Sequence, residues 1–114
     1  MIDISLISVS PETRLQDVMA CIDRSAVGIA LVADGDRRLL FTMTDGDLRR
    51  AVLHGLNLDM PAAQWASTWR VGILPVTAPI GTSLVEQLRL MHEHSIRHLP
   101  LLDDGLYRRW YSIL

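Results

Sequence analysis

The stretch that decides the fold is AVGIALV at residues 26–32, which is followed by Asp34-Gly35-Asp36. An almost uninterrupted apolar run of this length is typical of a β-strand buried on both faces. The Asp-Gly-Asp sequence after it is typical of a tight hairpin turn. The same arrangement returns 69 positions later as SIRHLPL at residues 95–101, followed by Asp103-Asp104-Gly105. The sequence therefore predicts two structural repeats.

Working outward from these strands, each half predicts the order strand, helix, strand, turn, strand. In the first half we expect a strand at residues 4–9, a helix that Ser10 caps and Pro11 begins, and a returning strand at residues 38–43. The second half is predicted to have a strand at 71–76, a helix capped by Thr82 or Ser83, a buried strand at 97–102 and a last strand at 106–113. Phe41 and Trp110 coincide in this alignment.

The two halves differ after their last strands. The first half continues into a helix at residues 47–53, whereas the chain stops at Leu114, where the matching helix would begin. We therefore predict an α/β (α+β) fold of two β-α-β-β-α repeats packed about a pseudo-two-fold axis, the second lacking its final helix. The expected boundaries are residues 1–58 for repeat 1, 59–70 for a linker with a short helix at 61–65, and 71–114 for repeat 2. The truncated second repeat leads us to expect a fragment of a longer protein.

Composition narrows the class of protein. The 114 residues suit one domain or one compact pair of repeats, and the 49% hydrophobic content suits a globular protein with a core. A net charge of −2 argues against a dedicated nucleic-acid binder. No apolar run is long enough for a membrane span, and the first residues do not resemble a signal peptide. Together with the single cysteine, Cys21, which we expect to be buried, these features favour a cytoplasmic location.

The stretch TDGDLRR at residues 44–50 carries the candidate chemistry. It joins a predicted strand to a predicted helix, so unpaired backbone N–H groups and a positive dipole end are available to an anion. The hydroxyl of Thr44 can donate to a phosphate, and the carboxylate of Asp47 can accept from ribose hydroxyls. These residues are equally suited to capping a helix without any ligand. No nucleophile elbow or Walker loop is present, and we predict neither catalytic residues nor a metal site.

These features resemble the tandem cystathionine-β-synthase (CBS) domain pair, or Bateman module. The resemblance covers essentially the whole chain and rests on the repeat, on TDGD at residues 44–47, and on IRHLPL at 96–101 with Asp103. The linker GLNLDMP at residues 55–61 is most similar to the subgroup found N-terminal to sugar-phosphate nucleotidyltransferases. A similar TDGDLRR segment also occurs in the CBS pairs of sugar-phosphate isomerases.

The resemblance implies a regulatory module, not an enzyme in itself. It would bind AMP, ADP or ATP in a cleft between the repeats, form a homodimer, and control an attached nucleotidyltransferase domain. The positions that match the family's motifs are Thr44 for phosphate or ribose, Asp47 for the ribose hydroxyls, Arg97 and His98 for the phosphates, and Val9 or Val76 for the adenine.

Two departures from the family pattern leave alternatives open. The family usually has glycine three positions before the threonine, where this chain has Phe41, so a bulky ring is expected to crowd the cleft. Ser112 matches Thr44 in the second half, but no aspartate follows it, so at most one good ribose site is expected. The alternatives are a structural dimerisation module that binds no nucleotide, or the CBS pair of a sugar-phosphate isomerase.

Overall fold

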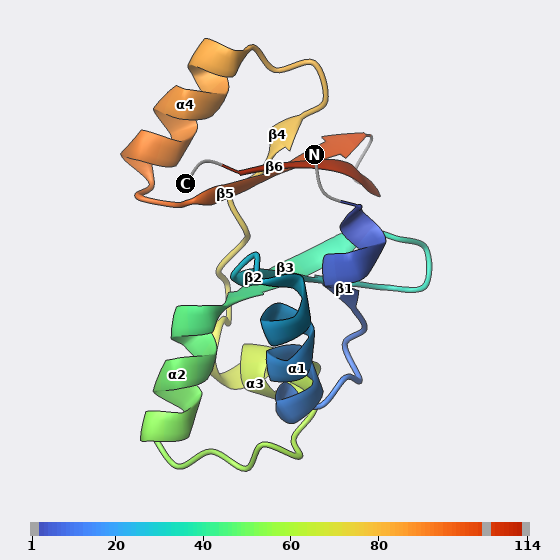
Figure 1. The fold of residues 1–114 in the computed structure, drawn as a ribbon, viewed down its shortest axis with the longest axis vertical. Helices are drawn as coiled ribbons and strands as arrows, with labels where there is room; N and C mark the ends of the chain where they lie inside the picture. Colours follow the sequence, from blue (N-terminus) through green and yellow to red (C-terminus); the bar gives the residue numbers. More distant parts are fainter. Residues whose placement is uncertain (1–2, 104–105, 113–114) are drawn as a thin grey trace.

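The structure is a computed structural model that describes residues 3–103 and 106–112, with side chains described for residues 3–103. Two three-stranded sheets lie face to face in the middle of the molecule (Figure 1). Helices α1, α2 and α3 cover the outer face of the first sheet, and α4 covers the outer face of the second. The elements in chain order are η1 (Ile4–Ile7), β1 (Ser8–Val9), α1 (Leu15–Ser25), β2 (Ile29–Ala33), β3 (Leu39–Thr44), α2 (Asp45–Leu53), α3 (Ala62–Trp69), β4 (Ala78–Pro79), α4 (Leu84–Glu93), β5 (His98–Asp103) and β6 (Leu106–Ser112). The predicted mixed α and β fold is confirmed.

Strand pairing confirms the internal repeat. In each sheet the central strand pairs in parallel with the strand before the helix and antiparallel with the strand after the turn. Val9 faces Val32 in the first sheet, and Ala78 faces Leu101 at the corresponding place in the second. The described part of the chain ends with β6 at Ser112, so the predicted lack of a final helix lies outside the described residues.

The central strand β2 divides the core of the first repeat into two faces. All five of its residues are buried, and successive side chains point to opposite faces. Ala30 and Val32 pack against the helices, where they join the buried side chains of α1, α2 and α3. Ile29, Leu31 and Ala33 pack instead against η1 and Leu102 of the second repeat, and so form the contact between the repeats.

The predicted first strand is too long in the first repeat and wrongly placed in the second. Residues 4–7 form a 3-10 helix capped by Asp3, and only Ser8 and Val9 pair as a strand. In the second repeat, residues 71–76 form no strand, and Val71, Ile73 and Leu74 are exposed. The pairing edge there is Ala78–Pro79, because these residues are the ones in register with Leu101 and Leu102.

Other predicted boundaries also shift. Ser10 does not cap α1: residues 10–13 form a turn, with the Ser10 N–H donating to Thr13 Oγ1 at 3.1 Å, and the helix begins at Leu15. Ser83 caps α4, as one of the two expected candidates. The connection between the halves forms a helix over Ala62–Trp69, longer than the predicted 61–65, and it packs on the first repeat through the buried Ala62 and Trp65.

The alignment of the returning strands needs a one-residue correction. Leu31 pairs with Thr42, and Pro100, which takes the place of Leu31, pairs with Trp110. Trp110 therefore corresponds to Thr42 and not to Phe41, because the paired residues Leu102 and Tyr107 are one residue closer in sequence than Ala33 and Leu39. The same register places Ser112 opposite His98 as Thr44 lies opposite Ile29, in agreement with the expected match of Ser112 to Thr44.

Cys21 is buried, as predicted, and its thiol donates to the carbonyl of Leu6 at 3.4 Å. Burial raises the pKa of this thiol, which makes it less reactive. Among the described residues, no helix has the length and apolar character needed to cross a membrane.

Candidate functional site

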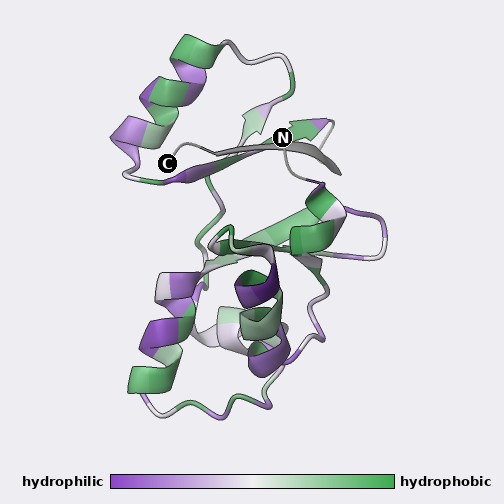
Figure 2. Ribbon diagram, in the orientation of Figure 1, coloured by the Kyte–Doolittle hydropathy of each residue, from purple (hydrophilic) through white to green (hydrophobic). Residues whose placement is uncertain are grey.

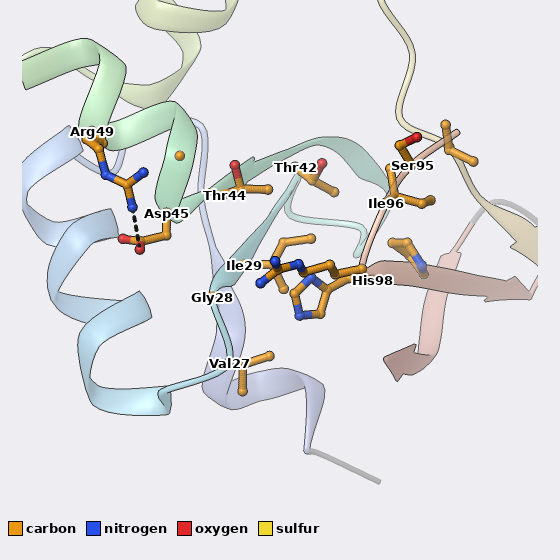
Figure 3. A pocket seen from close by; sticks show the side chains of 14 residues that line it. Val27, Gly28, Ile29, Thr42, Thr44, Asp45, Arg49, Ser95, Ile96 and His98 are labelled. Atoms are coloured by element: carbon orange, nitrogen blue, oxygen red, sulfur yellow. Dashed lines mark hydrogen bonds and ion pairs between the residues drawn. The ribbon is translucent and has the colours of Figure 1, made fainter. Parts of the chain in front are cut away.

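A cleft of about 830 Å³ lies between the two repeats. One wall comes from the start of β2, the end of β3 and the first turn of α2, and the other comes from residues 95–100 and Val76 (Figure 3). Its volume falls within the range of about 300–1,000 Å³ found for pockets that take small organic ligands. The lining residues are Val27, Gly28, Ile29, Thr42, Thr44, Asp45, Gly46, Arg49, Val76, Ser95, Ile96, Arg97, His98 and Pro100.

The first turn of α2 forms the polar end of the first wall. Thr44 caps the helix: its Oγ1 accepts from the Asp47 N–H at 3.2 Å, and its own N–H donates to Asp47 Oδ2 at 2.9 Å. The N–H of Asp45 donates to the Gly28 carbonyl at 3.1 Å and so holds the helix start against β2. Gly28 has φ of +93°, a conformation that favours glycine, and it bends the chain into β2. A positive helix end is therefore fixed at the cleft.

Arg49 adds a cation one turn along α2. Its guanidinium pairs with Asp45 at 3.5 Å, and both side chains are mostly exposed (Figure 3). Exposed ion pairs at this spacing contribute well under about 1 kcal/mol. Arg49 is therefore weakly held and can turn toward an anion in the cleft.

The second repeat contributes Arg97 and His98 at the start of β5. Arg97 is exposed, and His98 is partly buried with its ring hydrogen-bonded to the backbone of Val27 in the other repeat. Burial is the main cause that lowers the pKa of His98 below its ordinary value of 6.5, and the charge of Arg97 lowers it further. His98 therefore stands neutral in the contact between the repeats at neutral pH.

This shift predicts a pH-dependent stability. Because the folded state lowers the pKa of His98, the group's stabilising contribution is fully present above pH 6.5 and is lost as the pH falls through the lower folded value. We compare the free energy of unfolding, from urea denaturation, at about pH 7.5 and about pH 5. We expect it to fall less between the two pH values for His98→Gln than for the parent chain. Equal losses in the two proteins would contradict a depressed pKa at His98.

Of the six predicted site residues, the structure brings Thr44, Val76, Arg97 and His98 together in the cleft. Asp47 does not line it. The carboxylate of Asp47 is 5% exposed, and beyond the capping bond its Oδ1 accepts from Arg50 at 2.8 Å and from Arg70 at 2.7 Å. Val9 is half-buried against the core of the first repeat and also lies outside the cleft lining. The capping interpretation of Thr44 and Asp47 is therefore confirmed, and the ribose role of Asp47 stays a prediction.

Phe41 does not crowd the cleft. It is buried in the helix-side core, where its ring centroid lies 6.1 Å from that of Trp65. Strand alternation explains this placement, since Phe41 and Met43 point to the helices while Thr42 and Thr44 point to the cleft. The same alternation could have identified Thr42 from the sequence as a residue that lines the cleft, although Thr42 lies outside the motif at residues 44–50.

Comparisons with known proteins agree with this geometry. Residues 75–107 match the model of the CBS domain family. A CBS domain protein from Pyrobaculum aerophilum, solved in complex with AMP, superimposes with a TM-score of 0.80 at 22% identity over 98% of this chain and 87% of that one. The chain has the fold of a CBS-domain pair. An uncharacterized conserved protein from Pyrococcus horikoshii superimposes with a TM-score of 0.76 at 27% identity over 97% of this chain and 81% of that one.

Among curated proteins, this chain is 33% identical to the arabinose 5-phosphate isomerase of Yersinia pestis over 86% of the chain and 28% of that enzyme. The chain spans less than a third of the length of the curated relatives it matches. Within the described residues, no group of three or more histidine, cysteine or acidic side chains is arranged to hold a metal ion.

Proposed function

We propose that this CBS-domain pair is a regulatory module that binds an adenosine nucleotide in the cleft between its repeats. The observation that carries the proposal is that a capped helix start, two arginines and apolar side chains from both repeats line one cleft. The binding of AMP by a structural neighbour of the same fold supports the choice of nucleotide.

The cleft offers a chemical partner for each part of such a ligand. The helix start at Thr44 and the cations Arg49 and Arg97 suit the phosphates, because helix N-termini and guanidinium groups both favour anions. Val27 and Val76 provide apolar surface for the base. A ligand that touches both repeats favours one packing of the pair over another, and an attached enzyme can respond to that difference.

Isothermal titration with AMP, ADP, ATP and GTP, with and without Mg²⁺, tests the proposal. We expect saturable binding of an adenosine nucleotide near one site per chain. Arg97→Gln is expected to weaken it by roughly tenfold or more, since hydrogen bonds to charged groups contribute about 1.5–3 kcal/mol.

Arg24→Gln is the matched control for this titration. Arg24 is an exposed arginine at the end of α1 that does not line the cleft, so its loss should leave the affinity unchanged. The absence of heat and of thermal stabilisation at millimolar nucleotide would overturn the proposal, as would equal affinities of the parent chain and Arg97→Gln.

We further propose that the attached enzyme acts on a sugar phosphate. The sequence motifs favoured a nucleotidyltransferase, with an isomerase as the alternative. The identity to a protein named arabinose 5-phosphate isomerase supports the isomerase over the nucleotidyltransferase. Assay of the full-length protein for isomerisation and for nucleotidyl transfer, each with and without AMP, distinguishes the two.

A structural dimerisation role is the second candidate. Leu84, Val85 and Leu88 on α4 are 53%, 78% and 42% exposed, and Figure 2 shows hydrophobic segments along this helix. Exposed apolar side chains that gather on one element mark interaction sites. Sedimentation measures whether the chain forms a homodimer, and titration measures whether it binds nucleotide. A homodimer that binds no nucleotide would favour this role over the regulatory role.

A further inference from the structure

A second, smaller pocket of about 160 Å³ lies between α2 and α3. It shares no lining residue with the cleft and is formed by the first repeat and the chain just after α3. Its lining residues are Asp47, Arg50, Ala51, His54, Leu56, Trp65, Trp69 and Arg70.

Two guanidinium groups converge in this pocket on one carboxylate oxygen. Arg50 and Arg70 each donate through Nη2 to Oδ1 of Asp47, at 2.8 Å and 2.7 Å. The single negative charge of Asp47 therefore faces the positive charges of two arginines, and the Asp47 carboxylate is buried. Within residues 3–103 the remaining N–H groups of both arginines make no other hydrogen bond, so they are available to an anion.

Aromatic side chains hold this arrangement in place. The guanidinium carbon of Arg70 lies 5.1 Å from the ring centroid of Trp65, which is itself buried. Such a contact between a cation and a ring restrains the orientation of the arginine. His54 stacks on Trp69, with ring centroids 5.5 Å apart and planes 19° from parallel. The pocket thus has a cationic wall in which Arg70 is held against a ring, and flat aromatic walls.

We propose that this pocket is a phosphate site, which takes either free phosphate or the phosphate group of a small monoester. The planar arginine fork matches phosphate oxygens, and an uncompensated positive charge beside buried groups favours an anion. The volume is below the range of about 300–1,000 Å³ for pockets that hold drug-sized ligands. The pocket is therefore too small to enclose a nucleotide, and it shares no lining residue with the nucleotide cleft.

NMR of the tryptophan indole N–H groups tests the proposal on the whole chain, with the Trp69 signal assigned by Trp69→Phe. The probes are inorganic phosphate, arabinose 5-phosphate and arabinose at constant ionic strength. We expect saturable shifts of the Trp65 and Trp69 signals with both phosphate-bearing probes and none with arabinose. Tighter binding of arabinose 5-phosphate identifies a sugar monoester as the natural ligand, and equal binding identifies free phosphate.

Arg50→Gln is expected to weaken phosphate binding by roughly tenfold or more. The side chain of Arg50 is 63% exposed, so this variant should stay folded, which thermal unfolding checks. Arg24→Gln and the cleft variant Arg97→Gln should bind phosphate like the parent chain. No saturable shift, or equal binding by Arg50→Gln, would overturn the proposal. Loss of binding in Arg97→Gln would also overturn it, because the phosphate would then lie in the cleft.

Discussion

Replacement of Asp47 by alanine is expected to lower the free energy of unfolding by about 2–3 kcal/mol. Asp47 accepts from the N–H of Thr44 and from two arginines, and its carboxylate is almost fully buried. Without it, the Thr44 N–H loses its partner and two cations face each other with no counter-charge. The loss stays below that of a fully buried ion pair, because Arg50 is largely exposed and screened by water. Urea denaturation of the two proteins measures the difference.

Arg50→Gln is the control for this stability change. It removes only the exposed partner of Asp47 and is expected to cost less than about 0.5 kcal/mol. A change within about 0.5 kcal/mol for Asp47→Ala itself would show that the capping network contributes little.

The same Asp47→Ala variant tests the ribose role predicted from the family resemblance. If Asp47 binds the ribose hydroxyls, loss of the carboxylate weakens AMP binding by about 1–3 kcal/mol, measured where the variant is still folded. If the variant binds AMP as tightly as the parent, the ribose assignment is wrong. The carboxylate then serves only to hold Thr44 and the arginines.

The sequence predicted the parts of the fold that depend on local patterns. The apolar run at residues 26–32 and its copy marked the two central strands, because only a strand covered on both faces needs so continuous an apolar stretch. The repeat then fixed the order of the remaining elements. The family resemblance, and not the repeat alone, placed Thr44 in the same cleft as Arg97 and His98, and all three residues line it in the structure.

The errors arose where a distant partner decides the structure. Residues 71–76 have the apolar character of a strand, but the register of β5 selects Ala78–Pro79 as its partner, and no local pattern shows this. The contact of Asp47 with Arg70, 23 residues later, was also missed: Arg70 donates to the carboxylate, while the predicted ribose role of Asp47 stays a prediction. Sequence spacing gives no indication of that ion pair.

Phe41→Ala is expected to cost about 3–5 kcal/mol of folding free energy and to leave nucleotide affinity nearly unchanged. Phe41 is 9% exposed and packs on Trp65 in the helix-side core, so its removal leaves a cavity there. The cleft side of the same strand is formed by Thr42 and Thr44, which the substitution does not touch. Urea denaturation gives the stability, and titration with AMP below the unfolding transition gives the affinity.

Phe41→Leu and Thr42→Val separate the two faces of β3. Leucine retains most of the apolar volume, so Phe41→Leu should lose less stability than Phe41→Ala and should also keep its affinity. Thr42→Val changes the cleft wall and not the core, so it should alter affinity more than stability. If Phe41→Ala instead tightened AMP binding severalfold, the ring would be obstructing the ligand in solution. A side chain packed against Trp65 cannot block a cleft on the opposite face of its strand. Such a result would therefore show that Phe41 does not lie in the core when the nucleotide binds.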